Sequence, residues 1–229
     1  MTLLGAGVLA IWNDIAPGED AEFAAWHVRE HIPERISVPG FLRARRYGAI
    51  EGSPAYFNFY ETVSPAVLKS PAYLARLNDP TPWTRRVIAQ FRNTSRTVCD
   101  VALSLGAGEG GAIETIRLES AIADPAGYQG AMEAGVLRKL LAAPGITAAH
   151  LLRGRPADSA TGTAETALRQ GRDEVADWIL LFEAIDAASL RQAREGAASD
   201  AALMQAGTRP GSRRGIYALQ LSLAAGGAT

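Results

Sequence analysis

The alternation of hydrophobic and polar residues divides the chain into two runs of elements that follow the same order. In the first run, a period near two predicts strands at residues 7–14, 41–49, 55–62 and 97–105. A period near 3.6 predicts helical regions at residues 19–38 and 65–78, the second interrupted at Pro71. The order is repeated between residues 112 and 223, after a glycine-rich junction at 106–111. Each run therefore reads strand, helix, strand, strand, helix, strand.

Three blocks of the two runs also align residue by residue. Residues 56–64 match residues 178–186, and both blocks end on a helix N-cap residue, Ser64 or Asp186. The turn Pro39-Gly40-Phe41 matches Pro144-Gly145-Ile146, and residues 101–105 match residues 219–223. Blocks in a constant order indicate a tandem duplication. We predict a first unit at residues 1–106 and a second unit at residues 107–229.

The order of elements within each unit is that of a ferredoxin-like β-α-β-β-α-β fold. Such a unit has a four-stranded antiparallel sheet with both helices on one face, which leaves the other face of the sheet apolar and uncovered. Two copies in one chain can bury both of these faces against each other. The sequence therefore predicts an α+β fold, a pseudo-symmetric barrel of two units with the helices outside.

The two units differ most where the first unit is polar. Aligned on the Pro-Gly turns, His27 and His31 correspond to Met132 and Val136, and Asn58 corresponds to Leu180 in the later register. The other differing positions are Trp26, Arg43, Arg45 and Tyr47, which correspond to Ala131, Ala148, His150 and Leu152. We therefore predict that the first unit carries the function and that the second is a scaffold. The second unit also has a longer connection, residues 156–175, which either covers a site or forms a surface loop.

The first helix carries the strongest candidates for chemistry. On a wheel of 100° per residue, its apolar stripe contains Ala21, Ala25, Val28, Ile32 and Ile36. This places His31 toward the space between helix and sheet, and His27 at the rim of that space. Phe23 and Trp26 then point away from the stripe, toward a second contact surface. Because imidazole titrates near neutrality, both histidines are candidate acid/base groups, the alternative being surface histidines paired with glutamate.

Residues 27–31 also match the pattern His-x-x-Glu-His of some zinc proteases. A hydrolytic zinc site needs a third protein ligand and an open coordination position, and no matching ligand helix follows in the sequence. We therefore predict no metal site. A nonproteolytic metal site that uses His27 and His31 stays an alternative.

Polar residues on the predicted strands complete the candidate site. Period-two alternation sends Arg43, Arg45 and Tyr47 to one face of the second strand, and Asn58 and Tyr60 to one face of the third. Asn13 ends the first strand, and Trp83 follows a proline-rich loop that could close over a cleft. We predict His31, His27 and Tyr47 as catalytic residues. The predicted substrate-binding residues are Asn13, Arg43, Arg45, Asn58, Tyr60 and Trp83. The alternative is a solvated arginine face beside core aromatic residues.

Composition narrows the class of protein. The 229 residues include 23 Lys and Arg against 24 Asp and Glu, without the basic excess that nucleic-acid binding requires. The single cysteine, Cys99, excludes an intramolecular disulfide and fits a reducing compartment. The N-terminal residues lack a signal-peptide pattern, and no apolar stretch reaches the length of a membrane span. We therefore expect a cytoplasmic protein without a nucleic-acid or membrane partner.

The spacing Phe-x-x-Trp-His-x-x-x-His-x-Pro at residues 23–33, followed by Val38-Pro39-Gly40-Phe41, resembles the dimeric α+β barrel superfamily, and within it the EthD-like group. The chain is similar to a covalently fused dimer of such units, and a further homodimer stays open. The superfamily includes cofactor-free cyclases, isomerases, decarboxylases and monooxygenases, and haem enzymes. The resemblance implies that His31 is the helix histidine of the motif and that a ligand pocket lies between helices and sheet. The second unit lacks a helix histidine where one branch would bind haem.

These expectations lead to three hypotheses about function. The first is a cofactor-independent lyase, isomerase or cyclase that moves a proton on a small carbonyl or phenolic compound. In it, His31 is the acid/base group, and Tyr47, Asn58 or an arginine polarises the substrate oxygen. The second is a module that binds a small molecule or partner without turnover. The third is a haem- or metal-dependent oxidoreductase.

Overall fold

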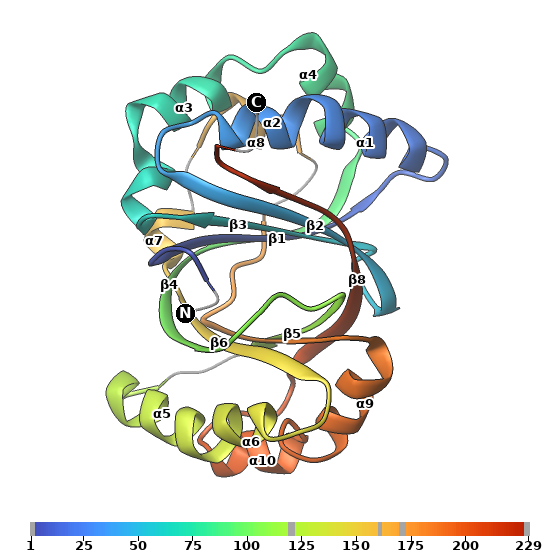
Figure 1. Ribbon diagram of the computed structural model, residues 1–229. Coiled ribbons are helices and arrows are strands. Elements are labelled where there is room, and N and C mark those ends of the chain that lie inside the picture. Colours follow the sequence, from blue (N-terminus) through green and yellow to red (C-terminus); the bar gives the residue numbers. More distant parts are fainter. Residues whose placement is uncertain (1–2, 119–121, 160–161, 170–172, 227–229) are drawn as a thin grey trace.

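Eight antiparallel strands form a closed barrel at the centre of the molecule (Figure 1). The computed structural model describes residues 3–118, 122–159, 162–169 and 173–226. The strands of the first half are β1 (Gly7–Ile15), β2 (Phe41–Gly52), β3 (Tyr56–Thr62) and β4 (Phe91–Gly106). Those of the second half are β5 (Ala112–Leu118), β6 (Ile146–Gly154), β7 (Trp178–Ala184) and β8 (Arg213–Ala224). Around the barrel the order is β1-β3-β2-β8-β5-β7-β6-β4.

The helices lie in two layers outside the barrel, one for each half of the chain (Figure 1). The first layer contains α1 (Asp20–Trp26), the π-helix η1 (His27–His31), α2 (Ile32–Ile36), the 3₁₀-helix η2 (Pro65–Lys69), α3 (Pro71–Asn78) and α4 (Pro82–Ile88). The second layer contains α5 (Pro125–Met132), the π-helix η3 (Glu133–Leu137), α6 (Arg138–Leu141), α9 (Ala187–Glu195) and α10 (Asp200–Gln205). Two short helices, α7 (Pro156–Ser159) and α8 (Ala164–Ala167), belong to the connection between β6 and β7.

The two halves pair their strands in corresponding registers. Gly7 of β1 lies opposite Thr62 of β3, and Ala112 of β5 lies opposite Ala184 of β7. Two further pairings, β2 with β8 and β4 with β6, join the halves and close the barrel. The predicted α+β barrel with outer helices is confirmed.

The barrel interior is filled by side chains. Trp12 stacks on Phe57 with ring centroids 4.7 Å apart, and Tyr47 and Tyr217 pack in the same buried cluster. Buried charged groups also lie inside the barrel. The guanidinium of Arg45 donates to Glu183 at 2.9 Å and to Glu61 at 3.1 Å. Eight strands give an interior just wide enough for such side chains, so the barrel is a core and not a channel.

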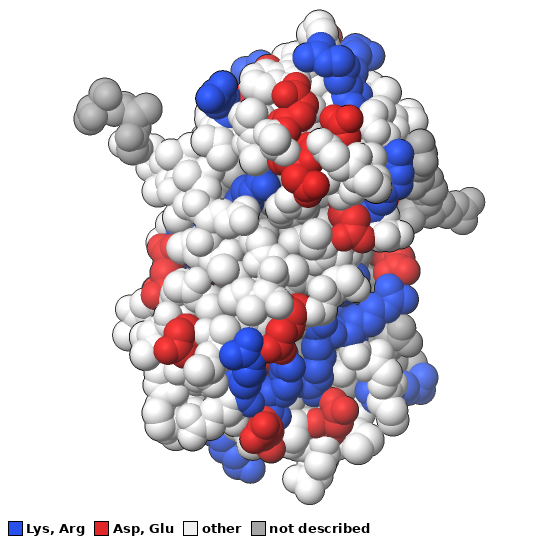
Figure 2. Space-filling model, turned by 90° about the vertical axis from the view of Figure 1, so that its right-hand side faces the viewer, with Lys and Arg blue, Asp and Glu red and all other residues white. Residues whose placement is uncertain are grey.

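The surface is covered by interspersed charges of both signs. Figure 2 looks onto the side of the molecule where β8 runs and shows basic groups beside acidic ones, with the basic groups denser in the lower half. Ion pairs link the two halves on the surface, for example Arg191 with Glu51 at 2.5 Å. None of the helices in the described part of the chain has the length and apolar character that a membrane crossing requires.

The first helix packs differently from the wheel prediction. Phe23 and Trp26, expected to point away from the core, are both fully buried, whereas Val28 is 45% exposed and Ala21 is exposed. The reason is the π-helical turn at residues 27–31, which adds a residue to one turn and shifts the buried face by one position. A wheel with a constant 100° step cannot follow such a shift.

The proline-rich loop expected before Trp83 is present at residues 79–81, and helix α4 begins directly after it, at Pro82. Pro82 occupies its first turn, where the missing backbone N–H costs nothing, and the hydroxyl of Thr81 accepts from the backbone N–H of Thr84 at 3.0 Å. Trp83 is thus held on a capped helix. The last strand of the first half also begins earlier than predicted, at Phe91.

Candidate functional site

A small enclosed cavity lies between the helix layer and the sheet of the first half. Its volume is about 30 Å³, which is roughly the space of one water molecule. The apolar part of its wall includes Ile11, Trp26 and Leu77. The polar part includes His27, His31, Arg35, Asn58, Tyr60 and Arg96. Polar groups from the first helical segment and from the strands β3 and β4 therefore meet at one buried point.

Two histidines on η1 form the centre of this wall. The rings of His27 and His31 stack with centroids 5.4 Å apart, and Trp26 lies against His31 at 4.2 Å. Nε2 of His27 is 3.1 Å from the hydroxyl oxygen of Tyr60. Nδ1 of each histidine is buried and has no hydrogen-bond partner among the described residues. The two histidines are four residues apart, so both rings lie on the same face of the helix.

Both imidazoles are held in the neutral form. Burial lowers the pKa of His27 well below 6.5, and the positive charges of Arg46 and Arg35 lower it further. Burial likewise lowers the pKa of His31, and Arg35 adds to the effect. Burial raises the pKa of the Tyr60 hydroxyl, which therefore keeps its proton near neutral pH. The site thus combines two neutral bases with one hydroxyl donor.

An asparagine pair joins the first and third strands beside the histidines. Asn58 Nδ2 donates to Asn13 Oδ1 at 2.9 Å, and Asn13 Nδ2 donates to the carbonyl of Asp14 at 3.3 Å. The buried Oδ1 of Asn58 has no partner in the described part of the chain. Asn58 therefore offers an acceptor to a ligand hydroxyl or N–H.

The long connection of the second half reaches this cavity. Glu165 of α8 is buried and forms an ion pair with Arg35 of α2, and Arg169 also lines the cavity. Of the two interpretations of residues 156–175, the described part of the connection supports the covering role. Arg35, Arg96, Glu165 and Arg169 were missed as site residues. Arg35 could have been found, because it corresponds to the apolar Leu140 in the alignment that revealed the histidines.

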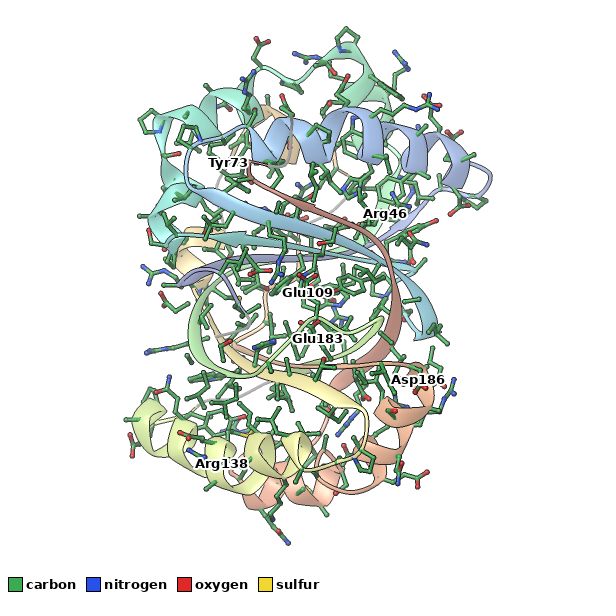
Figure 3. All side chains as sticks on the ribbon, in the orientation of Figure 1. Arg46, Tyr73, Glu109, Arg138, Glu183 and Asp186 are labelled. Carbon is green, nitrogen blue, oxygen red and sulfur yellow. The ribbon has the colours of Figure 1, made fainter. Side chains whose placement is uncertain are left out.

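The other predicted site residues lie away from this cavity. Arg43, Arg45 and Tyr47 point into the barrel, on the opposite face of the sheet, because side chains alternate along β2. Arg43 donates to Glu61 at 2.7 Å, and the buried hydroxyl of Tyr47 has no partner among the described residues. Figure 3 places Glu183 and Glu109 in this inner space and Tyr73 between the upper helices and the sheet. Trp83 lies on α4, and its ring N–H donates to Glu22 at 2.7 Å.

The structure therefore brings together His27, His31, Asn58 and Tyr60, with Asn13 directly behind Asn58. It separates them from Arg43, Arg45, Tyr47 and Trp83. Within the described residues, no group of three or more metal-ligating side chains is clustered.

At the equivalent place, the second half is closed by apolar packing. Met132, Val136 and Leu140 are fully buried in one cluster, together with Leu180 and Phe182 of β7. These five residues correspond by register to His27, His31, Arg35, Asn58 and Tyr60. The same backbone thus supports a polar cavity in one half and an apolar core in the other.

Comparison with known proteins identifies the fold. No protein-family model and no curated protein matches the sequence. Among solved structures, an anthrone oxidase-like protein aligns with a TM-score of 0.65 at 16% identity, covering 96% of this chain and 93% of the other. This chain has the dimeric α+β barrel fold. A candidate monooxygenase from Fusobacterium nucleatum aligns with a TM-score of 0.58 at 12% identity, covering 97% and 96%. Another from Lactobacillus acidophilus aligns with a TM-score of 0.59 at 7% identity, covering 96% and 97%.

Proposed function

We propose that this α+β barrel protein is a cofactor-independent enzyme of the lyase, isomerase or cyclase type, acting on a small carbonyl or phenolic compound. The observation that carries the proposal is the pair of buried, neutral imidazoles whose Nδ1 atoms have no hydrogen-bond partner in the described part of the chain. In this proposal the first half is the functional unit of an EthD-like tandem duplication, and the second half is its scaffold.

Unpaired nitrogens in a buried wall are unfavourable for folding alone. Leaving a buried polar group without a hydrogen bond costs about 1–3 kcal/mol, and the second half has apolar residues at the positions that correspond to the two histidines. A substrate that hydrogen-bonds to these nitrogens would offset this cost. The polar wall is therefore better explained by ligand chemistry than by stability.

The arrangement suits removal of an acidic proton. A neutral His31 accepts a proton from a phenolic O–H or from a C–H next to a carbonyl, and the resulting imidazolium returns it to another atom of the substrate. Since the pKa of His31 is lowered, its imidazole is a weak base, and the substrate proton must itself be acidic. The Tyr60 hydroxyl stabilises the negative oxygen that develops, while Asn58 Oδ1 accepts a hydrogen bond from a substrate hydroxyl.

A substrate can enter only if part of the wall moves. An aromatic ring needs several times the volume of one water, and the cavity measures about 30 Å³. The wall contributed by α8 is the smallest element of the site, a helix of four residues, and its buried contact with the first half is the Arg35–Glu165 ion pair. We expect opening to begin there.

Proton transfer can be tested without knowledge of the natural substrate. Exchange of the α-protons of a weakly acidic ketone such as 2-tetralone in D₂O is followed by NMR, with and without the protein. We expect acceleration by the wild-type protein and loss of roughly 10²–10⁴-fold in His31→Gln, the usual contribution of a general base. The matched control is Arg29→Gln, an exposed residue on the same helix that should exchange like wild type.

Two outcomes would contradict the proposal. If ketones or phenols bind without accelerated exchange, the cavity belongs to a binding module. If His31→Gln exchanges as fast as wild type, the base lies elsewhere. Far-ultraviolet circular dichroism of each variant separates loss of chemistry from loss of fold.

A further inference from the structure

Arg96 is a buried cation that has no acidic partner among the described residues. It lies on β4 opposite Ile11 of β1, is 3% exposed and lines the cavity beside the histidines. Its guanidinium donates one hydrogen bond, from Nη1 to the carbonyl of Ser159 at 3.3 Å. Across the described residues, no carboxylate lies within 4.0 Å of it. Buried charges in proteins are ordinarily paired, so the lack of a carboxylate here requires an explanation.

The second half supplies the matched comparison. Arg214 lies opposite Ile116, as Arg96 lies opposite Ile11, so the two arginines occupy the same register position. Arg214 has two carboxylates, Asp200 at 2.5 Å and Glu114 at 3.6 Å. An arginine is therefore present at this position in both halves, and among the described residues Arg214 has carboxylate partners whereas Arg96 has none.

The other charges around the cavity do not compensate Arg96. Arg35 already pairs with Glu34 at 2.8 Å and with Glu165. Arg169 pairs with Asp173, its side chain is 7% exposed, and its buried Nε has no hydrogen-bond partner among the described residues. The two histidines are neutral and contribute no charge. The carboxylates of Glu34, Glu165 and Asp173 therefore pair with the other two arginines, and among the described residues no ion pair is formed with Arg96.

We infer that Arg96, assisted by Arg169, binds the negatively charged group of the ligand, and that this ligand is a small organic carboxylate. A guanidinium presents N–H groups in a planar fork that matches the two oxygens of a carboxylate. The inference names the ligand class of the site proposed above, but it requires binding only and no turnover. It also gives the second half a role, because Arg169 comes from the connection between β6 and β7.

The test compares acids with their uncharged amides. Binding of formate, acetate and benzoate, and of formamide, acetamide and benzamide, is measured by titration calorimetry at constant ionic strength. We expect the protein to prefer the acids, and Arg96→Met to weaken their binding by roughly tenfold or more, because a charge-assisted hydrogen bond is lost. Arg29→Met, an exposed arginine outside the cavity, serves as the control and should bind as wild type does.

Stability of the unliganded variants gives the second measurement. Because Arg96 is buried without a carboxylate, Arg96→Met should melt at the same temperature as wild type or higher, whereas a structural arginine would lower the melting temperature. Equal binding of acids and amides, absence of binding by every acid, unchanged affinity in Arg96→Met, or a large loss of stability would each overturn the inference. His31→Gln should still bind the acids, so failure of the proposed catalysis and failure of the carboxylate site are distinguishable.

Discussion

The two halves of the molecule have similar backbones but differ in the residues between the first helix and the sheet. Both contain a first helix interrupted by a π turn, at His27–His31 in one half and at Glu133–Leu137 in the other. In the second half the side chains around the π turn are apolar, and the buried charge of this interface, Glu114, is paired with Arg194 and Arg214. In the first half the interface holds imidazoles, an amide and arginines around a cavity. Since the second half folds with apolar residues at the positions of His27, His31 and Asn58, polar residues at these positions are not a requirement of the fold. The second half is an internal control for the first.

Substituting the residue of one half by its counterpart from the other half should have the largest effect on stability. Val136→His inserts an imidazole without a partner into a fully packed apolar cluster, so we expect it to lower the free energy of unfolding by roughly 2–4 kcal/mol. His31→Val removes an unpartnered nitrogen and should change this free energy by about 1 kcal/mol or less. Urea denaturation of both variants measures the difference. Equal decreases in the free energy of unfolding would contradict the expected difference between the two interfaces.

The dependence of stability on pH should be the next largest effect. The pKa values of His27 and His31 lie below 6.5 in the folded protein, so between those values and 6.5 the unfolded chain binds more protons. Stability contributed by the neutral histidines is therefore fully present above pH 6.5 and is lost as the pH falls below it. Each histidine can add up to about 1.4 kcal/mol per pH unit to the slope.

The variant His27→Met/His31→Val carries the residues of the second half and should show a shallower slope between pH 6.5 and 5. Subtracting its unfolding free energies from those of wild type removes the contribution of carboxylates common to both. A difference that does not change with pH would mean that the histidines are not buried in the neutral form.

The smallest effect is expected inside the barrel, on the other face of the same sheet. Tyr47→Phe removes a buried hydroxyl that has no partner among the described residues, so stability should change by less than about 1 kcal/mol in either direction. The α-proton exchange of 2-tetralone should also stay at the wild-type rate, because Tyr47 lies outside the histidine cavity. If Tyr47→Phe lost the α-proton exchange, Tyr47 would be a catalytic residue and the reaction would take place inside the barrel.

Much of the fold and part of the site could be predicted from residue patterns alone. The strands β2 and β3 and the positions of His31, Asn58 and Tyr60 followed from periodicity and from the alignment of the two halves. Period-two alternation correctly grouped Arg43, Arg45 and Tyr47 on one face of β2. It could not say that this face is the inside of the barrel, because the sheet is buried on both faces and both sides contain polar residues.

The sequence by itself determined the order of elements, the barrel class and the polar difference between the two halves, because these depend on local periodicity and on residues compared at fixed spacing. The tertiary structure decided the rest. The π turn at residues 27–31 depends on how the helix packs, and with it Phe23 and Trp26, which were expected to point away from the core, are buried. Contacts across long sequence separations, such as Arg35 with Glu165, follow from chain crossing and leave no local pattern. For the same reason, only the folded chain shows that Arg214 pairs with carboxylates, whereas Arg96 has none within the residues that the structure describes.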